Sequence, residues 1–496
     1  MKNLIYASII MLGFWSCSDE NYAPEALNDR ISGDLVPGFN PIEVGASGDQ
    51  YNDIIENPFV LVNEQPVSTF SIDADGASYA NSRRFLQQNN TIPPASAIRT
   101  EEFINYFDLD YPYTNPSHPI ALNGEVSSCP WNTDHRLIRI GIKGRPLPEN
   151  DLPPANFVFL IDVSGSMASE DKLEMLKSGF KLFVDELSEE DRVAIVTYAG
   201  SAGVVLESTP GDQKTTIKDA IDRLGAGGST AGAEGILTAY EIARNNFIQS
   251  GNNRIIIGTD GDFNVGLSSQ DELIDIIEIE REFGIFLTVL GVGRGNLNDG
   301  ALEQIANNGN GNYEYIDNIE QLRKVFIYDY AKFLTVAKDV KVQVEFDPAI
   351  VESYRLIGYE NRLLSEEDFE DDERDAGEIG ADQNITALYE IVPASQTPAL
   401  ATPALTIDFR YKQPDSDTSV PMELPVFEQG FPFEQASDFT QFTASVALFG
   451  LLLRESAYSG DGTYDDILDW LDDVNLEDEH GFKAEFRELV ARARGL

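Results

Sequence analysis

Residues 157–167 have the sequence Phe157-Val-Phe-Leu-Ile-Asp162-Val-Ser164-Gly-Ser166-Met167, and this stretch decides the fold. Its first half is an apolar run rich in β-branched and aromatic residues, which is typical of a buried strand in a parallel sheet. The run breaks into one carboxylate and two hydroxyls at alternate positions. Apolar residues at helical spacing follow, from Leu173 to Leu187. A strand-to-helix turn of this kind places Asp162, Ser164 and Ser166 at the carboxyl edge of the sheet, where α/β proteins bind ligands.

The three side chains in this turn offer only oxygen atoms. Hard oxygen donors suit Mg2+, Mn2+ or Ca2+ better than a soft metal. A simpler interpretation is that Asp162, Ser164 and Ser166 cap the helix that follows. A metal site therefore needs further donors elsewhere in the chain.

Asp-x-Ser-x-Ser after an apolar strand resembles the metal-ion-dependent adhesion site of von Willebrand factor type A domains. That family implies a threonine in a later glycine-rich loop and an aspartate after a later strand. Gly225-Ala-Gly-Gly-Ser-Thr230 and Ile255-Ile-Ile-Gly-Thr-Asp260 supply them in that order. The resemblance implies that Ser164, Ser166 and Thr230 are metal ligands, with Asp162 and Asp260 as inner-shell or outer-shell carboxylates. The implied ion is Mg2+, with Mn2+ or Ca2+ as alternatives.

In this family one coordination position stays open for a carboxylate from a partner. The resemblance therefore implies a non-enzymatic protein that binds a protein ligand, or another carboxylate-bearing ligand, through a divalent metal ion. The ligand would supply an Asp or Glu side chain. The alternative is a structural scaffold or assembly factor whose metal ion only stabilises the fold.

Enzymatic alternatives find little support. A haloacid-type phosphatase would need an aspartate where Ser164 stands, and no Gly-x-x-x-x-Gly-Lys-Ser/Thr loop is present. The three histidines, His118, His135 and His480, lie outside the metal-binding motifs, and His135 is expected to be exposed. A magnesium-assisted hydrolase stays open, because an ion with a free position can activate water. We predict no catalytic residue.

The N-terminus predicts secretion and anchoring. Residues 1–17 combine one lysine with a short apolar core and end in Cys17, which is typical of a secretory signal and resembles a bacterial lipoprotein lipobox. We expect Cys17 to carry the lipid and the protein to sit in the cell envelope, on the outer membrane. Ser18-Asp19-Glu20 resembles a surface-export signal. Cys129 then has no disulfide partner, and a small buried hydrophobe is its expected role.

The formal net charge of −49 over 496 residues opposes binding to nucleic acid phosphates. The expected fold is an α/β domain of the type A class, with a doubly wound and mainly parallel sheet, inserted into a β-sandwich. An N-terminal α+β region and C-terminal helices complete it, and both resemble regions of one family of bacterial secreted type A domain proteins. The expected segments are a signal peptide (1–17), a flexible tether (18–52), the N-terminal region (53–153), the type A domain (154–335), a β-rich region that pairs with strands at 117–146 (336–425), and a helical extension (426–496).

Overall fold

The computed structural model describes residues 43–44, 48–72, 75–148, 152–199, 202–228, 232–261, 270–374, 376–394, 403–428 and 430–496. Cys17 and Thr230 lie outside these ranges, as do the predicted signal peptide and most of the predicted tether. Within the described part of the chain, no helix has the length and apolar character that crossing a membrane requires.

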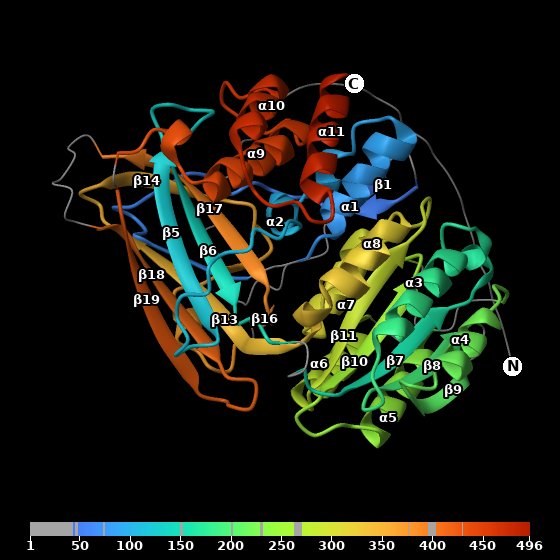
Figure 1. The fold of residues 1–496 in the computed structure, drawn as a ribbon. Helices are drawn as coiled ribbons and strands as arrows, with labels where there is room; N and C mark the ends of the chain where they lie inside the picture. Colours follow the sequence, from blue (N-terminus) through green and yellow to red (C-terminus); the bar gives the residue numbers. More distant parts are fainter. Residues whose placement is uncertain are drawn as a thin grey trace, which may run out of the picture. The chain divides into compact units, whose positions relative to one another are not determined.

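The α/β domain is built on a six-stranded sheet with the strand order β12-β11-β10-β7-β8-β9 (Figure 1). Five of its strands run parallel, and β9 is an antiparallel edge strand. The strands are β7 (Ala155–Asp162), β8 (Arg192–Tyr198), β9 (Ala202–Pro210), β10 (Asn252–Thr259), β11 (Ile285–Val292) and β12 (Tyr313–Ile316). The prediction of a mainly parallel sheet is confirmed. The strand β9 was not predicted, because its half-exposed residues do not form an apolar run.

Helices cover both faces of this sheet because the side chains of β7 alternate between two apolar cores. Val158 and Leu160 face α5, whereas Phe157, Phe159 and Ile161 face α3. The helices are α3 (Leu173–Glu186), α4 (Lys214–Asp222), α5 (Gly232–Asn245), α6 (Gln270–Glu282), α7 (Asp299–Asn308) and α8 (Ile319–Arg323). The sequence over 319–333 predicts a single closing helix, and this prediction is wrong: α8 passes into a π-helical turn at Lys324–Tyr328 and a 3-10 turn at Tyr330–Phe333.

Strands from both sides of the α/β domain form the β-sandwich, as predicted. In one sheet β6 pairs with β17 from Arg136↔Ile391 to Lys143↔Asn384. Its strand order is β3-β14-β17-β6-β5, and that of the other sheet is β15-β4-β13-β18-β19, with β16 beside β13. The strands are β3 (Val60–Leu61), β4 (Val67–Ser71), β5 (Ile120–Ser128), β6 (Arg136–Gly144), β13 (Thr335–Phe346), β14 (Val351–Ile357), β15 (Leu363–Leu364), β16 (Gly377–Gly380), β17 (Asn384–Pro393), β18 (Pro403–Lys412) and β19 (Ser419–Phe427). Apolar side chains from the two sheets fill one core.

The C-terminal helices pack on the N-terminal ones. The helices α9 (Asp438–Leu453), α10 (Tyr464–Asp473) and α11 (Phe482–Arg494) share an apolar cluster with α1 (Ala77–Arg84) and α2 (Thr100–Asn105). Phe107 contacts Phe442 and Phe486 edge-on, with ring centroids 5.1 and 5.5 Å apart. Cys129 lies in this cluster and is fully buried, which confirms its expected role.

Buried ion pairs attach the N-terminal helix α1 to the α/β domain. Arg83 donates to both carboxylate oxygens of Asp317, just after β12, at 2.8 and 2.6 Å. It also donates to Gln321 of α8 and to Glu485 of α11. The next residue, Arg84, pairs with Asp49 at 2.8 Å. Because these groups are buried, the ion pairs are charge-assisted hydrogen bonds that water does not weaken. They fix the N-terminal helix to the α/β domain and to the C-terminal helices.

Candidate metal centre

The Asp-x-Ser-x-Ser motif folds back on itself at the end of β7. Asp162 Oδ1 accepts a hydrogen bond from the Ser164 backbone N–H at 2.8 Å, and the hydroxyls of Ser164 and Ser166 lie 2.9 Å apart. Ser164 precedes a 3-10 turn, Gly165–Ala168, and its side chain makes no capping hydrogen bond to that turn. Helix capping therefore does not account for the motif.

Asp260 joins these residues because β10 lies beside β7 in parallel register. Gly258 pairs with Ile161, so the residues after both strands emerge at the same edge of the sheet. Thr259 donates from its hydroxyl to Asp162 Oδ2 at 3.3 Å. Asp162 and Asp260 are both fully buried. Two carboxylates and two hydroxyls from distant parts of the sequence thus lie at one edge of the sheet.

The glycine-rich loop reaches the same turn. Gly227 donates from its backbone to the Val163 carbonyl at 2.7 Å, and Gly165 donates to the Gly228 carbonyl at 3.2 Å. Gly228 has a φ of 109°, and a Cβ there would come within 3.2 Å of the Ala199 carbonyl oxygen. Only glycine tolerates that backbone conformation easily. The predicted ligand Thr230 follows this loop but lies outside the described residues.

A lysine that the motif does not contain completes the cluster. Lys172 Nζ donates to Asp260 Oδ2 at 2.8 Å and to Asn296 Oδ1 at 3.0 Å, and its side chain is buried. No spacing pattern in the sequence predicts either Lys172 or Asn296. One signal exists in retrospect: Lys172 is the N-cap residue of α3, where the helix dipole disfavours a cation unless a carboxylate faces it.

Asp49 and Gln50 hold the loop that carries Asn296 in place. Asp49 Oδ1 accepts hydrogen bonds from the backbone of Gly295 at 2.7 Å and of Leu297 at 3.3 Å. Gln50, in the short strand β2 (Gln50–Tyr51), donates from its backbone to the Leu297 carbonyl at 2.7 Å. The position of Asn296 therefore depends on a segment that lies far away in the sequence.

The electrostatics of the two aspartates differ. Burial raises the pKa of Asp162, and the nearby charge of Asp260 raises it further. Burial would also raise the pKa of Asp260, but the hydrogen bond and charge of Lys172, together with the polar side chains of Asn296 and Ser166, outweigh it, so this pKa is lowered. Asp260 Oδ1 is buried and accepts no hydrogen bond from the described residues.

These features fit a divalent cation with hard oxygen ligands. A buried carboxylate oxygen without a donor requires an explanation, and a water molecule bound to an ion beside Ser164 and Ser166 would supply one. A dication would also offset the repulsion that raises the pKa of Asp162. Among the described residues, this centre included, no group of three or more His, Cys, Asp or Glu residues could hold a metal ion. The centre offers two carboxylates and the hydroxyls of Ser164 and Ser166.

Three family models together match most of the chain. The model described as "von Willebrand factor type A domain" matches residues 156–326, "von Willebrand factor" matches 46–139, and "Uncharacterized protein YfbK, C-terminal" matches 331–496. The protein YfbK of Escherichia coli K12 is 40% identical over 472 residues, which cover 90% of this chain and 81% of that protein. The chain belongs to the YfbK family. Its members combine a type A domain with a C-terminal extension.

More distant relatives share less of the chain. The Synechocystis protein sll0103 is 29% identical over 195 residues, which cover 39% of this chain and 45% of that protein. The solved structure of a von Willebrand factor type A protein from Catenulispora acidiphila covers 77% of this chain and 89% of its own, with 15% identity and a TM-score of 0.41. Membership of the YfbK family supports a binding or scaffold role of the type A kind, since type A domains are generally not enzymes.

The histidines of this YfbK relative have partners away from the centre. His118 Nδ1 lies 2.9 Å from the Tyr411 hydroxyl, and the His480 ring stacks on Tyr328. The expectation that His135 is exposed is wrong, because its Nδ1 lies 2.6 Å from Glu390 Oε1 and its side chain is only 18% exposed. Among the described contacts, none joins a histidine to Asp162, Ser164, Ser166 or Asp260, so a Ser-His-Asp arrangement is not built here.

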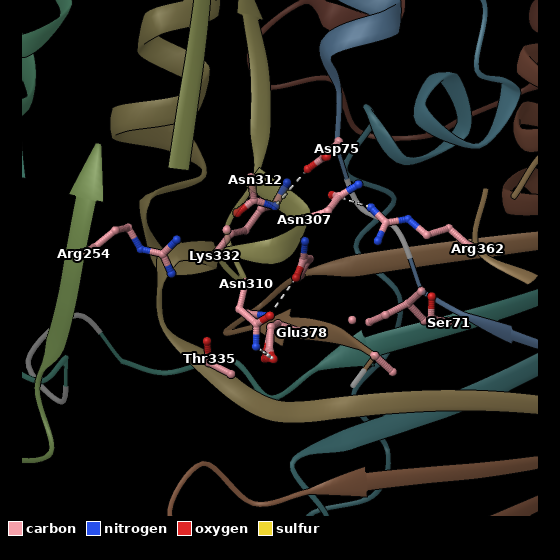
Figure 2. Close-up of a pocket in the computed structure, with 16 residues that line it drawn as sticks. Ser71, Asp75, Arg254, Asn307, Asn310, Asn312, Lys332, Thr335, Arg362 and Glu378 are labelled. Atoms are coloured by element: carbon pink, nitrogen blue, oxygen red, sulfur yellow. Dashed lines mark hydrogen bonds between the residues drawn. The ribbon is translucent and has the colours of Figure 1, made fainter. Parts of the chain in front are cut away.

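A polar cavity of about 130 Å³ lies between the α/β domain and the sandwich, apart from the metal centre (Figure 2). Arg254 lines it and donates to the Thr288 hydroxyl at 2.8 Å and to the Phe333 carbonyl at 3.0 Å. Asn310 donates to Glu378 at 2.6 Å across the cavity. A hydrogen bond between side chains thus joins the α/β domain to the sandwich at this cavity, which is typical of a polar interface between two domains.

Proposed function

We propose that the type A domain of this protein binds a protein ligand, or another carboxylate-bearing ligand, through a divalent ion held by Asp162, Ser164, Ser166, Thr230 and Asp260. Mg2+ is the proposed ion, with Mn2+ or Ca2+ as alternatives. Asp162 and Asp260 would neutralise the ion, while the neutral hydroxyls leave it able to attract an acidic side chain of the partner. The ion would thus supply an open coordination position, and the protein would act as a receptor and not as an enzyme.

One observation carries this proposal. The structure brings Asp162 and Asp260 to the same edge of the sheet, both fully buried, and leaves Asp260 Oδ1 without a donor among the described residues. Two buried carboxylates this close together are costly unless a cation lies near both of them. Lys172 donates to Oδ2 of Asp260 and leaves Oδ1 for another partner. A divalent ion beside the hydroxyls of Ser164 and Ser166 would be that partner, directly or through water.

The test separates metal binding from ligand binding. Isothermal titration of the purified protein with Mg2+ and Mn2+ should give saturable binding to one site. Capture of envelope proteins on the immobilised protein should then succeed with Mg2+ and fail in EDTA. Thr230→Ala should lose the captured ligand while keeping metal affinity within about tenfold, because it removes one neutral ligand and no charge.

Two outcomes would contradict this reading. Absence of metal binding to the parent protein removes the proposed site. A ligand that is held equally well in EDTA would show that the ion only stabilises the fold, which is the scaffold alternative.

We further propose that Cys17 is the lipidated first residue of the mature chain and anchors it to the outer membrane, in the cell envelope. The support is the apolar stretch that ends in Cys17. The tether expected over residues 18–52 ends before Asp49, because Asp49 and Tyr51 are buried and Asp49 pairs with Arg84. Cys17→Ser should move the protein from the membrane fraction to the soluble fraction, as measured by immunoblotting. Mass spectrometry of the parent should show an acylated N-terminal peptide; its absence, with unchanged membrane retention of Cys17→Ser, would disprove the anchor.

A further inference from the structure

We infer that Lys172 sets the charge of the metal centre so that metal affinity is weakened and affinity for an anionic ligand is strengthened. This inference rests on the proposed function and specifies the ligand: a carboxylate with no cation close to it. Lys172 is not part of the five-residue motif, and its role follows from its contacts.

The lysine is built into the centre. Its ammonium has two oxygen partners, Asp260 Oδ2 at 2.8 Å and Asn296 Oδ1 at 3.0 Å, and the side chain is only 8% exposed. Its methylene stem lies against Gly293, where a Cβ would come within 2.3 Å of Lys172 Cε. Gly293 has a φ of 75°, so glycine is favoured there for two independent reasons.

The oxygen partner Asn296 is also held in place. Its neighbours Gly295 and Leu297 both donate to Asp49, whose carboxylate is fully buried and paired with Arg84. The ammonium therefore cannot leave the centre by a simple rotation of an exposed loop. A fixed charge at a fixed place has a defined effect on any ion that shares Asp260.

The charge balance gives the direction of that effect. Asp162 and Asp260 contribute two negative charges and Lys172 one positive charge, so these three groups carry −1. With a divalent ion they carry +1, whereas without the lysine they would carry zero. The ammonium and the ion repel each other across a single carboxylate, which lowers metal affinity by a factor on the order of ten or more.

The surplus positive charge then favours an acidic ligand. An incoming carboxylate brings the centre from +1 to zero, and burial of the two aspartates makes this neutralisation strong because the local dielectric is low. The rest of the chain is acidic, with a formal net charge of −49. Local attraction at the centre is therefore what allows an anionic ligand to approach an acidic protein.

The experiment uses Mn2+ as the metal and acetate as the anionic probe. Electron paramagnetic resonance measures free Mn2+ in titrations of the full-length chain carrying Cys17→Ser, with and without acetate, and with acetamide as the neutral control at equal ionic strength. In the parent, acetate should tighten Mn2+ binding and acetamide should not, because coupling between two ligands is reciprocal.

Lys172→Met should bind Mn2+ about tenfold more tightly than the parent and should lose most of the acetate effect. Lys172→Gln, which is also neutral but can still donate to Asp260, should behave in the same way and covers the case in which the methionine variant fails to fold. Lys181→Met is the matched control. It removes the same charge from the outer side of α3, where Lys181 pairs with Asp222 at 2.8 Å, and should match the parent.

The outcomes are distinguishable. If the neutral variants bind Mn2+ no tighter than the parent, or more weakly, Lys172 only positions Asp260 and the charge inference is wrong. If acetate tightens Mn2+ binding equally in the parent and in both neutral variants, the ligand part is wrong. If the parent binds no Mn2+ at all, the proposed function fails and the inference falls with it.

Discussion

Replacing Asp162 with asparagine should remove the rise in thermal stability that Mg2+ gives the parent protein. The substitution takes one of two carboxylate charges from the centre and should lower Mg2+ affinity roughly 100-fold. A ligand that binds only the folded state stabilises it by RT ln(1 + [L]/Kd), so a large rise in Kd cancels the shift at moderate Mg2+ concentration. In EDTA the variant should be at least as stable as the parent, because burial and the charge of Asp260 both raise the pKa of Asp162 and thus disfavour its ionised form.

Differential scanning calorimetry of separate EDTA-treated and Mg2+-loaded samples measures this shift directly. Asp222→Asn is the matched control, since it makes the same change on a side chain that is 56% exposed and pairs with Lys181. It should keep the full Mg2+ shift. A variant at position 162 that keeps the parent's Mg2+ shift would show that the ion binds elsewhere.

Arg83→Met should cost about 3–5 kcal/mol of unfolding free energy, because it leaves the buried carboxylate of Asp317 without its cation. Both side chains are 1% exposed, and the guanidinium also bonds to Tyr106, Gln321 and Glu485. The loss should appear in the fluorescence of Trp131, which is buried in the cluster of N-terminal and C-terminal helices. Urea unfolding followed by the combined emission of Trp131 and Trp470, which packs against the same cluster, measures the shift in midpoint.

The control for this prediction is Arg487→Met, which removes an arginine that is 42% exposed and pairs with an exposed aspartate, Asp472. Surface pairs of this kind contribute little, so its midpoint should stay close to that of the parent. Equal midpoints for Arg83→Met and the parent would mean that α1 is not held by this ion pair.

Local patterns in the sequence were enough to predict most of the fold. A strand that is buried on both faces has a continuous apolar run, as at 157–161. A strand that is buried on one face alternates apolar and polar residues, as at 340–346. The split sandwich was also predicted, and the pairing of β6 with β17 confirms it. The edge strand β9 and the broken helix at 319–333 were missed, since exposed edges and π-helical turns have no strong periodicity.

The residues of the candidate centre also fall into two groups, those that sequence patterns predict and those that they do not. Asp162, Ser164 and Ser166 are linked by spacing, and Asp260 is linked to them because it ends a neighbouring strand. Lys172 and Asn296 meet Asp260 only through tertiary packing, and Asp49 reaches the centre only through the loop behind it. These contacts join residues that are far apart in the sequence, so no local sequence pattern could predict them.

The split of the sandwich by the α/β domain also decides the order in which the chain can be assembled. The strands β5 and β6 are paired as a local hairpin, whereas the second neighbour of β6, β17, comes only after the whole α/β domain in the sequence. In the same way, β4 is separated from its partner β13 by that domain. Pairings so distant in sequence form slowly, because the loop between them must close first. The α/β domain between them is continuous in sequence, so its folding shortens the path between the waiting strands. A chain cut before β17 would keep one edge of β6 open, and an unpaired edge is a template for aggregation.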